Sequence, residues 1–273
     1  MKIDAFTQLY GIIGHPVKHS LSPLIQNLAF THLGINAVYL AFDVTDLPSA
    51  LAGVRALGIK GLSVTIPHKI NIIPFLDNID EMAQKIGAVN TVVNQDGHLL
   101  GFNTDWTGAI LALKEKGEIK GKRYVILGAG GAARAVAFGL KQEGAEVMIV
   151  NRTYEKGKAL AKELNAEASP WDNLPEIKAY GLINTTPIGM WPEIRHTPVD
   201  EKVVTNFALV MDTIYRPLET KLLHLAKKAG CICVNGLNML IYQGAAQFTL
   251  WTGKKAPVEK MLKAAEGVLV NNG

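Results

Sequence analysis

The stretch RYVILGAGGAAR, residues Arg123–Arg134, decides the fold of this chain. Its first five residues are rich in β-formers, and Gly128-x-Gly130-x-x-Ala133 then fits the glycine fingerprint of a dinucleotide-binding turn. The Ala-rich stretch that follows, up to Gly144, has the length and composition of a helix. Because glycines let the backbone approach a pyrophosphate, and the first N–H groups of a helix lack intrahelical partners, the stretch predicts nucleotide binding.

Basic residues follow the next apolar run, residues 146–150, which we expect to be the second parallel strand. An NAD site usually carries Asp or Glu there to hold the ribose, whereas this chain has Arg152. A guanidinium pairs bidentately with phosphate, and Lys156 lies one helical turn further on. We therefore predict NADP(H) rather than NAD(H); the alternative is that both side chains are solvated surface charges.

The length of 273 residues predicts two domains, because about 120 residues precede the glycine turn and must form a separate unit. We expect a fold of two α/β domains with a cleft between them. The first, a substrate domain with a mainly parallel sheet, comprises residues 1–105 and is completed by C-terminal helices in residues 238–273. The second, residues 106–237, is a Rossmann domain that binds NADP.

Composition excludes several classes of protein. A hydrophobic content of 48% with 19% charged residues is typical of a globular protein, and the sequence contains no run that predicts a membrane span or a signal peptide. A net charge of +4 without a basic run gives no support for nucleic-acid binding. We expect a cytoplasmic protein that binds small anionic molecules, with no nucleic-acid or membrane partner and no metal site.

The first half alternates between strand and helix patterns, which predicts a parallel sheet with ligand-binding turns at its carboxyl edge. Two such turns are Ser20–Ser22 and Thr65–Lys69. The expected strands of this half are residues 9–14, 37–44 and 61–66, the helices are residues 23–33 and 47–57, and a hairpin joins residues 89–95 to 98–102. Later strands are expected at residues 180–184, 207–211 and 231–234, and helices at 238–251 and 258–270.

Nicotinamide chemistry needs a proton donor and acceptor beside the substrate. Lys69 follows a strand end, and Asp105 lies where the hairpin enters a helix, so we expect both at the rim that faces the second domain. Each also has a structural explanation, since Asp105 could cap the helix that starts at Trp106 and Lys69 could be solvated. Ser22 is expected to be the N-cap of the helix that begins with Pro23, a position from which a hydroxyl can also hold a carboxylate.

Several ordered motifs together resemble the shikimate dehydrogenase family along essentially the whole chain. They are Gly14-His-Pro-Val-Lys-His-Ser20-Leu-Ser22-Pro23, Val64-Thr65-Ile-Pro67-His-Lys69, Gly87-Ala-Val-Asn90-Thr91, Asn103-Thr-Asp105-Trp106, Gly128-Ala-Gly130-Gly131-Ala, Asn151-Arg152-Thr153, Asn184-Thr-Thr-Pro187-Ile-Gly189-Met190 and Gly236-Leu-Asn-Met239-Leu with Gln243. The family reaction is the reversible NADP-linked reduction of 3-dehydroshikimate to shikimate, a step of aromatic amino-acid biosynthesis. The chain departs from the commoner pattern at Ser63, Gln26, Asn235 and Asn238.

The resemblance implies roles for individual residues. The catalytic pair would be Lys69 and Asp105. The substrate carboxylate would be held by Ser20 and Ser22 with help from Tyr215, and the ring hydroxyls by Thr65, Asn90, Asp105 and Gln243. The cofactor would contact Gly128, Ala129, Gly130, Gly131 and Ala132 at the pyrophosphate, Asn151, Arg152, Thr153 and Lys156 at the 2′-phosphate, and Thr186, Met211 and Gly236 near the nicotinamide.

Other functions remain open at this level. The first is a quinate/shikimate dehydrogenase with relaxed cofactor and substrate use, although Arg152 argues against NAD. Folate-linked methylene dehydrogenases have a similar architecture, but Ser20, Ser22 and Lys69 do not suggest a pterin site. A catalytically silent NADP-sensing protein would keep the glycine turn and lose the proton-transfer residues, whereas both are present here. The protein is expected to be a monomer or a homodimer.

Overall fold

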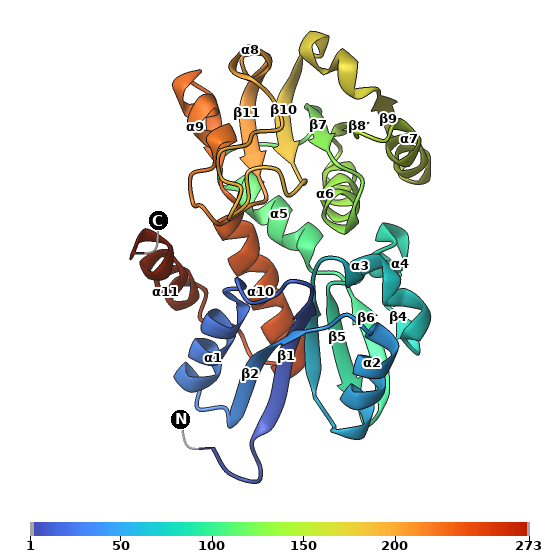
Figure 1. Cartoon of the computed structure of the whole chain (residues 1–273), viewed down its shortest axis with the longest axis vertical. Coiled ribbons are helices and arrows are strands. Elements are labelled where there is room, and N and C mark those ends of the chain that lie inside the picture. The colour runs from blue at the N-terminus through green and yellow to red at the C-terminus, as the bar shows by residue number, and fades with distance from the viewer. Residues whose placement is uncertain (1–2, 272–273) are drawn as a thin grey trace. The chain divides into compact units, whose positions relative to one another are not determined.

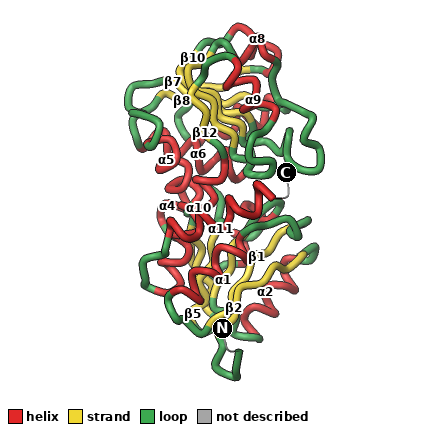
Figure 2. The backbone as a smooth tube through the Cα atoms, turned by 90° about the vertical axis from the view of Figure 1, so that its left-hand side faces the viewer, coloured by secondary structure: helices red, strands yellow, loops and turns green. Residues whose placement is uncertain are grey.

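The computed structural model describes residues 3–271 and divides the chain into two compact units. The first contains the chain up to Thr104 together with Gln243–Gly267, and the second contains Asp105–Tyr242 and the chain from Val268. Each unit has its own six-stranded sheet, drawn in yellow in Figure 2. Helix α10 (Gly236–Thr252) begins in the second unit and ends in the first, and α11 (Val258–Asn271) runs from the first into the second.

The first sheet has the strand order β2-β1-β3-β5-β6-β4 (Figure 1). Its strands are β1 (Gln8–Gly14), β2 (Ala37–Asp43), β3 (Gly61–Val64), β4 (Asn78–Ile79), β5 (Thr91–Gln95) and β6 (His98–Phe102). Strands β1, β2 and β3 are parallel, as the alternation predicted, and β5 runs antiparallel to both of its neighbours. The hairpin turns at Asp96 and Gly97, which both have a positive φ, as a tight two-residue turn requires.

Helices cover both faces of this sheet. Its helical segments are α1 (Ser22–His32), α2 (Leu47–Ala56), α3 (His68–Asn71), the 3₁₀ helix η1 (Ile73–Phe75) and α4 (Glu81–Ile86). An aliphatic core that includes Leu51, Leu62 and Val92 packs α2 against one face. On the other face, aromatic rings of β1, α1 and α10 pack at tilted angles with centroid separations of 5.1–5.5 Å, so α10 completes this core.

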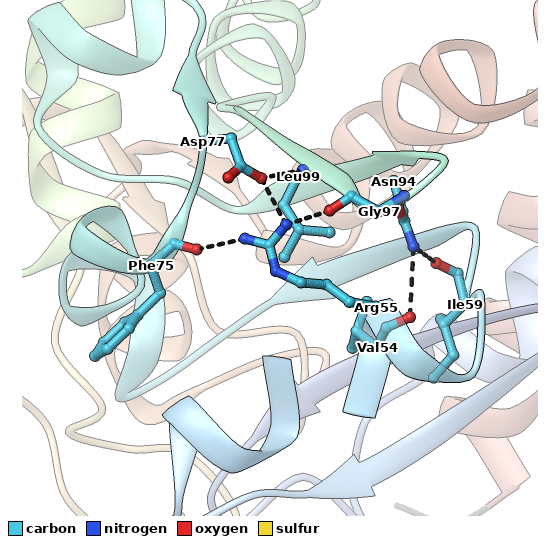
Figure 3. Close-up of polar contacts among 8 residues, drawn as sticks. All are labelled: Val54, Arg55, Ile59, Phe75, Asp77, Asn94, Gly97 and Leu99. Atoms are coloured by element: carbon cyan, nitrogen blue, oxygen red, sulfur yellow. Dashed lines mark hydrogen bonds and ion pairs between the residues drawn. The ribbon is translucent and has the colours of Figure 1, made fainter. Parts of the chain in front are cut away.

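A polar anchor secures the β5–β6 hairpin (Figure 3). The Arg55 guanidinium of α2 donates to the Asp77 carboxylate at 2.6 Å, to the Phe75 carbonyl at 3.1 Å and to the Gly97 carbonyl. The same Asp77 carboxylate accepts from the Leu99 N–H at 2.7 Å. The pKa of Asp77 is lowered chiefly by the hydrogen bond from Arg55. One side chain thus joins three segments of the first unit.

The second sheet has the order β12-β11-β10-β7-β8-β9 and is entirely parallel. Its strands are β7 (Arg123–Leu127), β8 (Glu146–Val150), β9 (Glu167–Ser169), β10 (Ala179–Asn184), β11 (Phe207–Asp212) and β12 (Ile232–Val234). One face is covered by α5 (Asp105–Lys114), α6 (Gly131–Gln142) and α7 (Tyr154–Glu163), and the other by α8 (Glu201–Val204), α9 (Lys221–Lys228) and the 3₁₀ helix η2 (Trp171–Glu176). This is the predicted doubly wound Rossmann arrangement, with its switch point between β7 and β10.

Some expected elements differ from the structure. Ser22 is the first residue of α1 rather than its N-cap, a position that Leu21 occupies without a side-chain hydrogen bond. The Ser22 N–H instead donates to the Ser20 hydroxyl oxygen at 3.2 Å, so the earlier serine supplies the acceptor expected of an N-cap. Strand β3 ends at Val64 instead of Ile66, because residues 65–67 form the turn into α3. The short edge strands β4 and β9 were not predicted.

Every helix among the described residues is too short or too polar to cross a bilayer. Within the same residues, side chains of His, Cys, Asp and Glu do not gather in groups of three or more that could ligate a metal ion.

Candidate active site

The glycine turn after β7 has the geometry of a pyrophosphate cradle. Gly128 has a φ of +114°, and a Cβ there would lie 2.7 Å from the Thr185 hydroxyl, so only glycine fits. Gly130 precedes α6 in an extended conformation, has no side chain with which to cap the helix, and faces open space. The first N–H groups of α6 are therefore accessible to an anion, which fits the cofactor that the sequence predicts.

The four residues expected at the 2′-phosphate lie between β8 and the first turn of α7. The Asn151 side-chain amide donates to the Thr153 carbonyl at 2.8 Å, and the Lys156 N–H donates to the same carbonyl at 3.0 Å. This turn keeps Arg152 and Lys156 exposed near the carboxyl end of β8. Two flexible cations beside a strand that neighbours β7 can pair with a phosphate group.

The residues expected near the nicotinamide lie in the same unit, at or after the carboxyl ends of β10, β11 and β12. Thr186 follows β10, and its methyl group would be 3.3 Å from a Cβ on Gly128, so it borders the glycine turn. Met211 is buried near the end of β11. Gly236 begins α10 so close to the turn after β11 that a Cβ would collide with the Thr213 carbonyl oxygen and lie 2.6 Å from that of Ile214.

In the first unit, the serine turn lies at the carboxyl end of β1. Ser22 is 3% exposed, and its side chain shares a hydrogen bond with the phenol of Tyr39. Burial raises the pKa of Tyr39, against hydrogen bonds from Ser63 and Ser22. The Tyr39 hydroxyl donates to Ser63 at 2.5 Å, so a buried tyrosine supports the predicted carboxylate site.

Asn90 is the centre of a buried polar network. Its Oδ1 accepts from the Thr104 N–H and the Thr91 hydroxyl, at 2.8 and 2.7 Å, which fixes the orientation of the amide. Its Nδ2 donates to Gln243 Oε1 at 3.2 Å. Gln247 of α10 completes the network through bonds of 3.0 Å to the Asn90 carbonyl and the Thr91 hydroxyl, and it also accepts from Ser63. Two residues expected at the substrate ring are thus in contact.

The predicted catalytic residues are both connected to the Asn90 region through the backbone. The Lys69 carbonyl accepts from the Val89 N–H at 2.8 Å, one residue before Asn90. Asp105 follows Thr104, whose N–H binds Asn90, and it is 4% exposed as the first residue of α5. Lys69 belongs to the first unit and is partly buried in α3, whereas Asp105 belongs to the second.

The remaining candidates are the residues Thr65 and Tyr215. Thr65 follows β3 and its N–H donates to the Ile13 carbonyl at 3.0 Å, which places it at the carboxyl edge of the first sheet. Tyr215 lies in the turn after β11, in the second unit. Residues that the sequence pattern did not single out include Tyr39 and Gln247, because nothing in their spacing marks them; only the topology brings them to Ser22 and Asn90.

The fold and the two sets of residues define an α/β protein with a dinucleotide-binding Rossmann unit and a polar site on a separate sheet. Three family models match it: the shikimate dehydrogenase substrate binding domain over residues 12–92, the shikimate/quinate 5-dehydrogenase model over residues 110–185, and the shikimate 5'-dehydrogenase C-terminal domain over residues 236–266.

Relatives match over nearly the whole chain. "Shikimate dehydrogenase (NADP(+))" of Moorella thermoacetica is 48% identical over 98% of this chain and 96% of its own. A crystal structure of a shikimate dehydrogenase in complex with NADP+ has a TM-score of 0.91 at 48% identity and covers 98% of both chains. The Thermus thermophilus enzyme, in complex with NADP(H) and shikimate, has a TM-score of 0.88 at 39% identity over 96% of this chain and all of that one.

The chain belongs to the shikimate dehydrogenase family. The family, the fold class, the oxidoreductase activity and the NADP cofactor predicted from the sequence are confirmed.

Proposed function

We propose that this protein catalyses the reversible NADP(H)-dependent reduction of 3-dehydroshikimate to shikimate through the residues identified above. The observation that carries the proposal is the Asn90 network, which connects a predicted substrate ligand, Gln243, to the backbone beside Lys69 and Asp105. Family membership over nearly the full length supports it.

Substrate binding follows from the chemistry of the first unit. Ser20 and Ser22, with help from Tyr215, hold the carboxylate. Hydroxyl and amide groups of Thr65, Asn90 and Gln243 hold the ring hydroxyls, because each can donate or accept a hydrogen bond. A nearly buried amide whose orientation is already fixed loses little conformational entropy on binding.

Lys69 and Asp105 carry the proton transfer. During reduction, the Lys69 ammonium donates a hydrogen bond and then a proton to the ketone oxygen as negative charge develops there. In the oxidation direction, Lys69 takes that proton back, and Asp105 orients the ammonium and the reacting hydroxyl. The bound nicotinamide supplies or accepts the hydride.

The second unit holds NADP. The turn from Gly128 to Ala132 binds the pyrophosphate, and Thr186, Met211 and Gly236 border the nicotinamide. The 2′-phosphate is bound by Asn151, Arg152, Thr153 and Lys156. The partners are therefore small molecules. A cytoplasmic location and a monomeric or homodimeric state complete the proposal.

An absorbance assay at about 340 nm tests the function by offering shikimate or quinate with NADP+ or NAD+. We expect the highest kcat/KM for the pair shikimate and NADP+. A preference for quinate with NAD+ would support the alternative dehydrogenase, and binding of NADPH without turnover of either acid would support a silent sensor.

Single variants test the two catalytic residues. Lys69→Ala and Asp105→Asn are each expected to lower kcat by on the order of 10²–10⁴, the usual effect of losing a positioned acid or base. Lys85→Ala and Asp96→Asn are matched controls, because both residues are exposed in the first unit. Near-normal turnover of either catalytic variant would remove that residue from the mechanism.

A further inference from the structure

Three segments of the second unit meet around one buried carboxyl group, that of Asp212. They are the turn after β10 that carries Thr186, the turn after β11 that leads to Tyr215, and the start of α10 at Gly236. Asp212 is the last residue of β11, is fully buried, and lies opposite Asn184, the last residue of β10, in the sheet.

Three groups donate hydrogen bonds to the Asp212 carboxyl. Oδ1 accepts from the Asn184 side-chain amide and from the Ile214 N–H, both at 3.1 Å, and Oδ2 accepts from the Thr220 hydroxyl at 2.7 Å. None of these donors is a cation. Burial raises the pKa of Asp212 to about 7, although all three hydrogen bonds lower it.

Hydrogen bonds of the Asn184 side chain connect Asp212 to Thr186. Asn184 Oδ1 accepts from the Thr186 N–H at 3.0 Å and from its hydroxyl at 2.7 Å. Because a backbone N–H can only donate, the Asn184 amide has one orientation, with its NH₂ group toward Asp212. The position of Thr186 therefore depends on a chain of two side chains that ends at Asp212.

The second connection runs through Ile214 to α10. Its N–H is held by Asp212, and its carbonyl accepts from the Gly236 N–H at 3.2 Å. Gly236 leaves no room for a side chain between α10 and this turn. A shift of residues 213–214 would therefore move the first residue of α10 and the chain that leads into Tyr215.

We propose that Asp212 is a positioning residue that holds Thr186, the turn before Tyr215 and Gly236 in one arrangement at the nicotinamide end of the cofactor site. It acts through its hydrogen bonds, without touching the substrate or cofactor. The inference rests on the proposed function, which assigns these three segments to the nicotinamide.

The test separates the nicotinamide end of the site from the adenosine end. The probe for the adenosine end is adenosine 2′,5′-bisphosphate, which carries the 2′-phosphate and lacks the nicotinamide. For Asp212→Ala we expect kcat with shikimate and NADP+ to fall at least about tenfold, because small displacements of reacting groups are costly, while the bisphosphate Kd stays within about twofold of the wild-type value.

Asp212→Asn is the conservative variant. Its Oδ1 can accept from Asn184 and Ile214, and its NH₂ group can donate to Thr220, so we expect it to retain at least about a third of the wild-type kcat. Asp200→Asn is the matched control, since Asp200 caps α8 in the same unit and is exposed. If Asp212→Ala fails to fold, Asn184→Ala removes the side chain that links Asp212 to Thr186. This variant should also lower kcat while leaving the bisphosphate Kd within about twofold of the wild-type value.

The proposal is overturned if the variant that folds, Asp212→Ala or Asn184→Ala, keeps the wild-type kcat. It is equally overturned if that variant raises the bisphosphate Kd by as large a factor as it lowers kcat. It is also overturned if Asp212→Asn loses as much activity as Asp212→Ala, which would assign the effect to charge. A wild-type protein without dehydrogenase activity would refute the proposed function instead. In that case, the ratio of the affinity for NADPH to the affinity for the bisphosphate would test the role of Asp212. We expect this ratio to be at least about threefold lower in Asp212→Ala than in the wild-type protein.

Discussion

Replacing Asp212 with Asn should change how the stability of the protein depends on pH. Burial raises the pKa of this carboxyl to about 7 from an ordinary value of 3.8. Between those two values the folded protein binds a proton that the unfolded chain has released, so the free energy of unfolding falls as the pH rises. The stabilisation from the protonated carboxyl is complete below pH 3.8 and lost above about pH 7.

The size of the effect follows from the same two values. The difference between 3.8 and about 7 corresponds to about 4 kcal/mol, and about 3 kcal/mol of it develops between pH 5 and pH 8. Asn does not titrate and forms hydrogen bonds much as the protonated carboxyl does. The free energy of unfolding of Asp212→Asn, relative to the wild-type value, should therefore increase by about 3 kcal/mol from pH 5 to pH 8.

Urea unfolding at the two pH values measures this change. The tryptophans Trp106, Trp171 and Trp191 lie in the same unit as Asp212, and their fluorescence reports its unfolding. Asp200→Asn controls for the loss of one carboxylate, since that residue is exposed. If the difference between Asp212→Asn and wild type stays constant within about 0.5 kcal/mol, the carboxyl is not a destabilised buried acid and the reasoning is wrong.

Three further predictions concern cofactor choice, close packing and the polar anchor. Arg152→Asp should lower kcat/KM for NADP+ and reduce its preference over NAD+ by about tenfold or more, since a carboxylate repels the 2′-phosphate; an unchanged ratio would contradict the assignment. Gly236→Ala should lower the free energy of unfolding by about 1–3 kcal/mol through overpacking, whereas Gly267→Ala, in open space on α11, should be neutral or raise it by up to about 1 kcal/mol; equal effects in urea melts would argue against the collision. Arg55→Met should lower the free energy of unfolding by about 1–3 kcal/mol, because three acceptors lose their donor. Lys85→Met, which removes an exposed ion pair with Glu81, should lower it by less than about 0.5 kcal/mol. Equal losses in the two variants would show that the Arg55 hydrogen bonds do not stabilise the first unit.

Most strands of the second unit, with the exception of β9, were predicted well because local sequence signals mark their ends. Strands β7 and β8 have the predicted limits, since a glycine turn ends the first and Asn151-Arg152 follows the second. Strands β4 and β9 have two and three residues, too few for an alternating pattern to emerge, and they form only as edges of a sheet whose register is set elsewhere.

The candidate site was predictable where its residues are close in sequence or form family motifs, as in the serine turn and the glycine turn. Asp212 was not, because an acidic residue at the end of an apolar strand is usually solvated. Its burial depends on Asn184, 28 residues earlier, and on the parallel pairing of β10 with β11. The prediction that Ser22 is the N-cap was wrong because Ser20 also has a hydroxyl within reach of the start of α1.

Two of the departures from the commoner family pattern, Ser63 and Asn238, have hydrogen-bond partners on neighbouring elements. The Ser63 hydroxyl accepts a hydrogen bond from Tyr39 and donates one to Gln247 at 2.7 Å, so this side chain joins β3 to α10. Asn238 donates to Glu115 Oε2 at 2.6 Å, and the Tyr242 hydroxyl, one turn later in α10, donates to the other oxygen of the same carboxylate. Ser63 and Asn238 therefore both help to hold α10, the helix that carries Gly236 and Gln243, although neither is itself a predicted ligand.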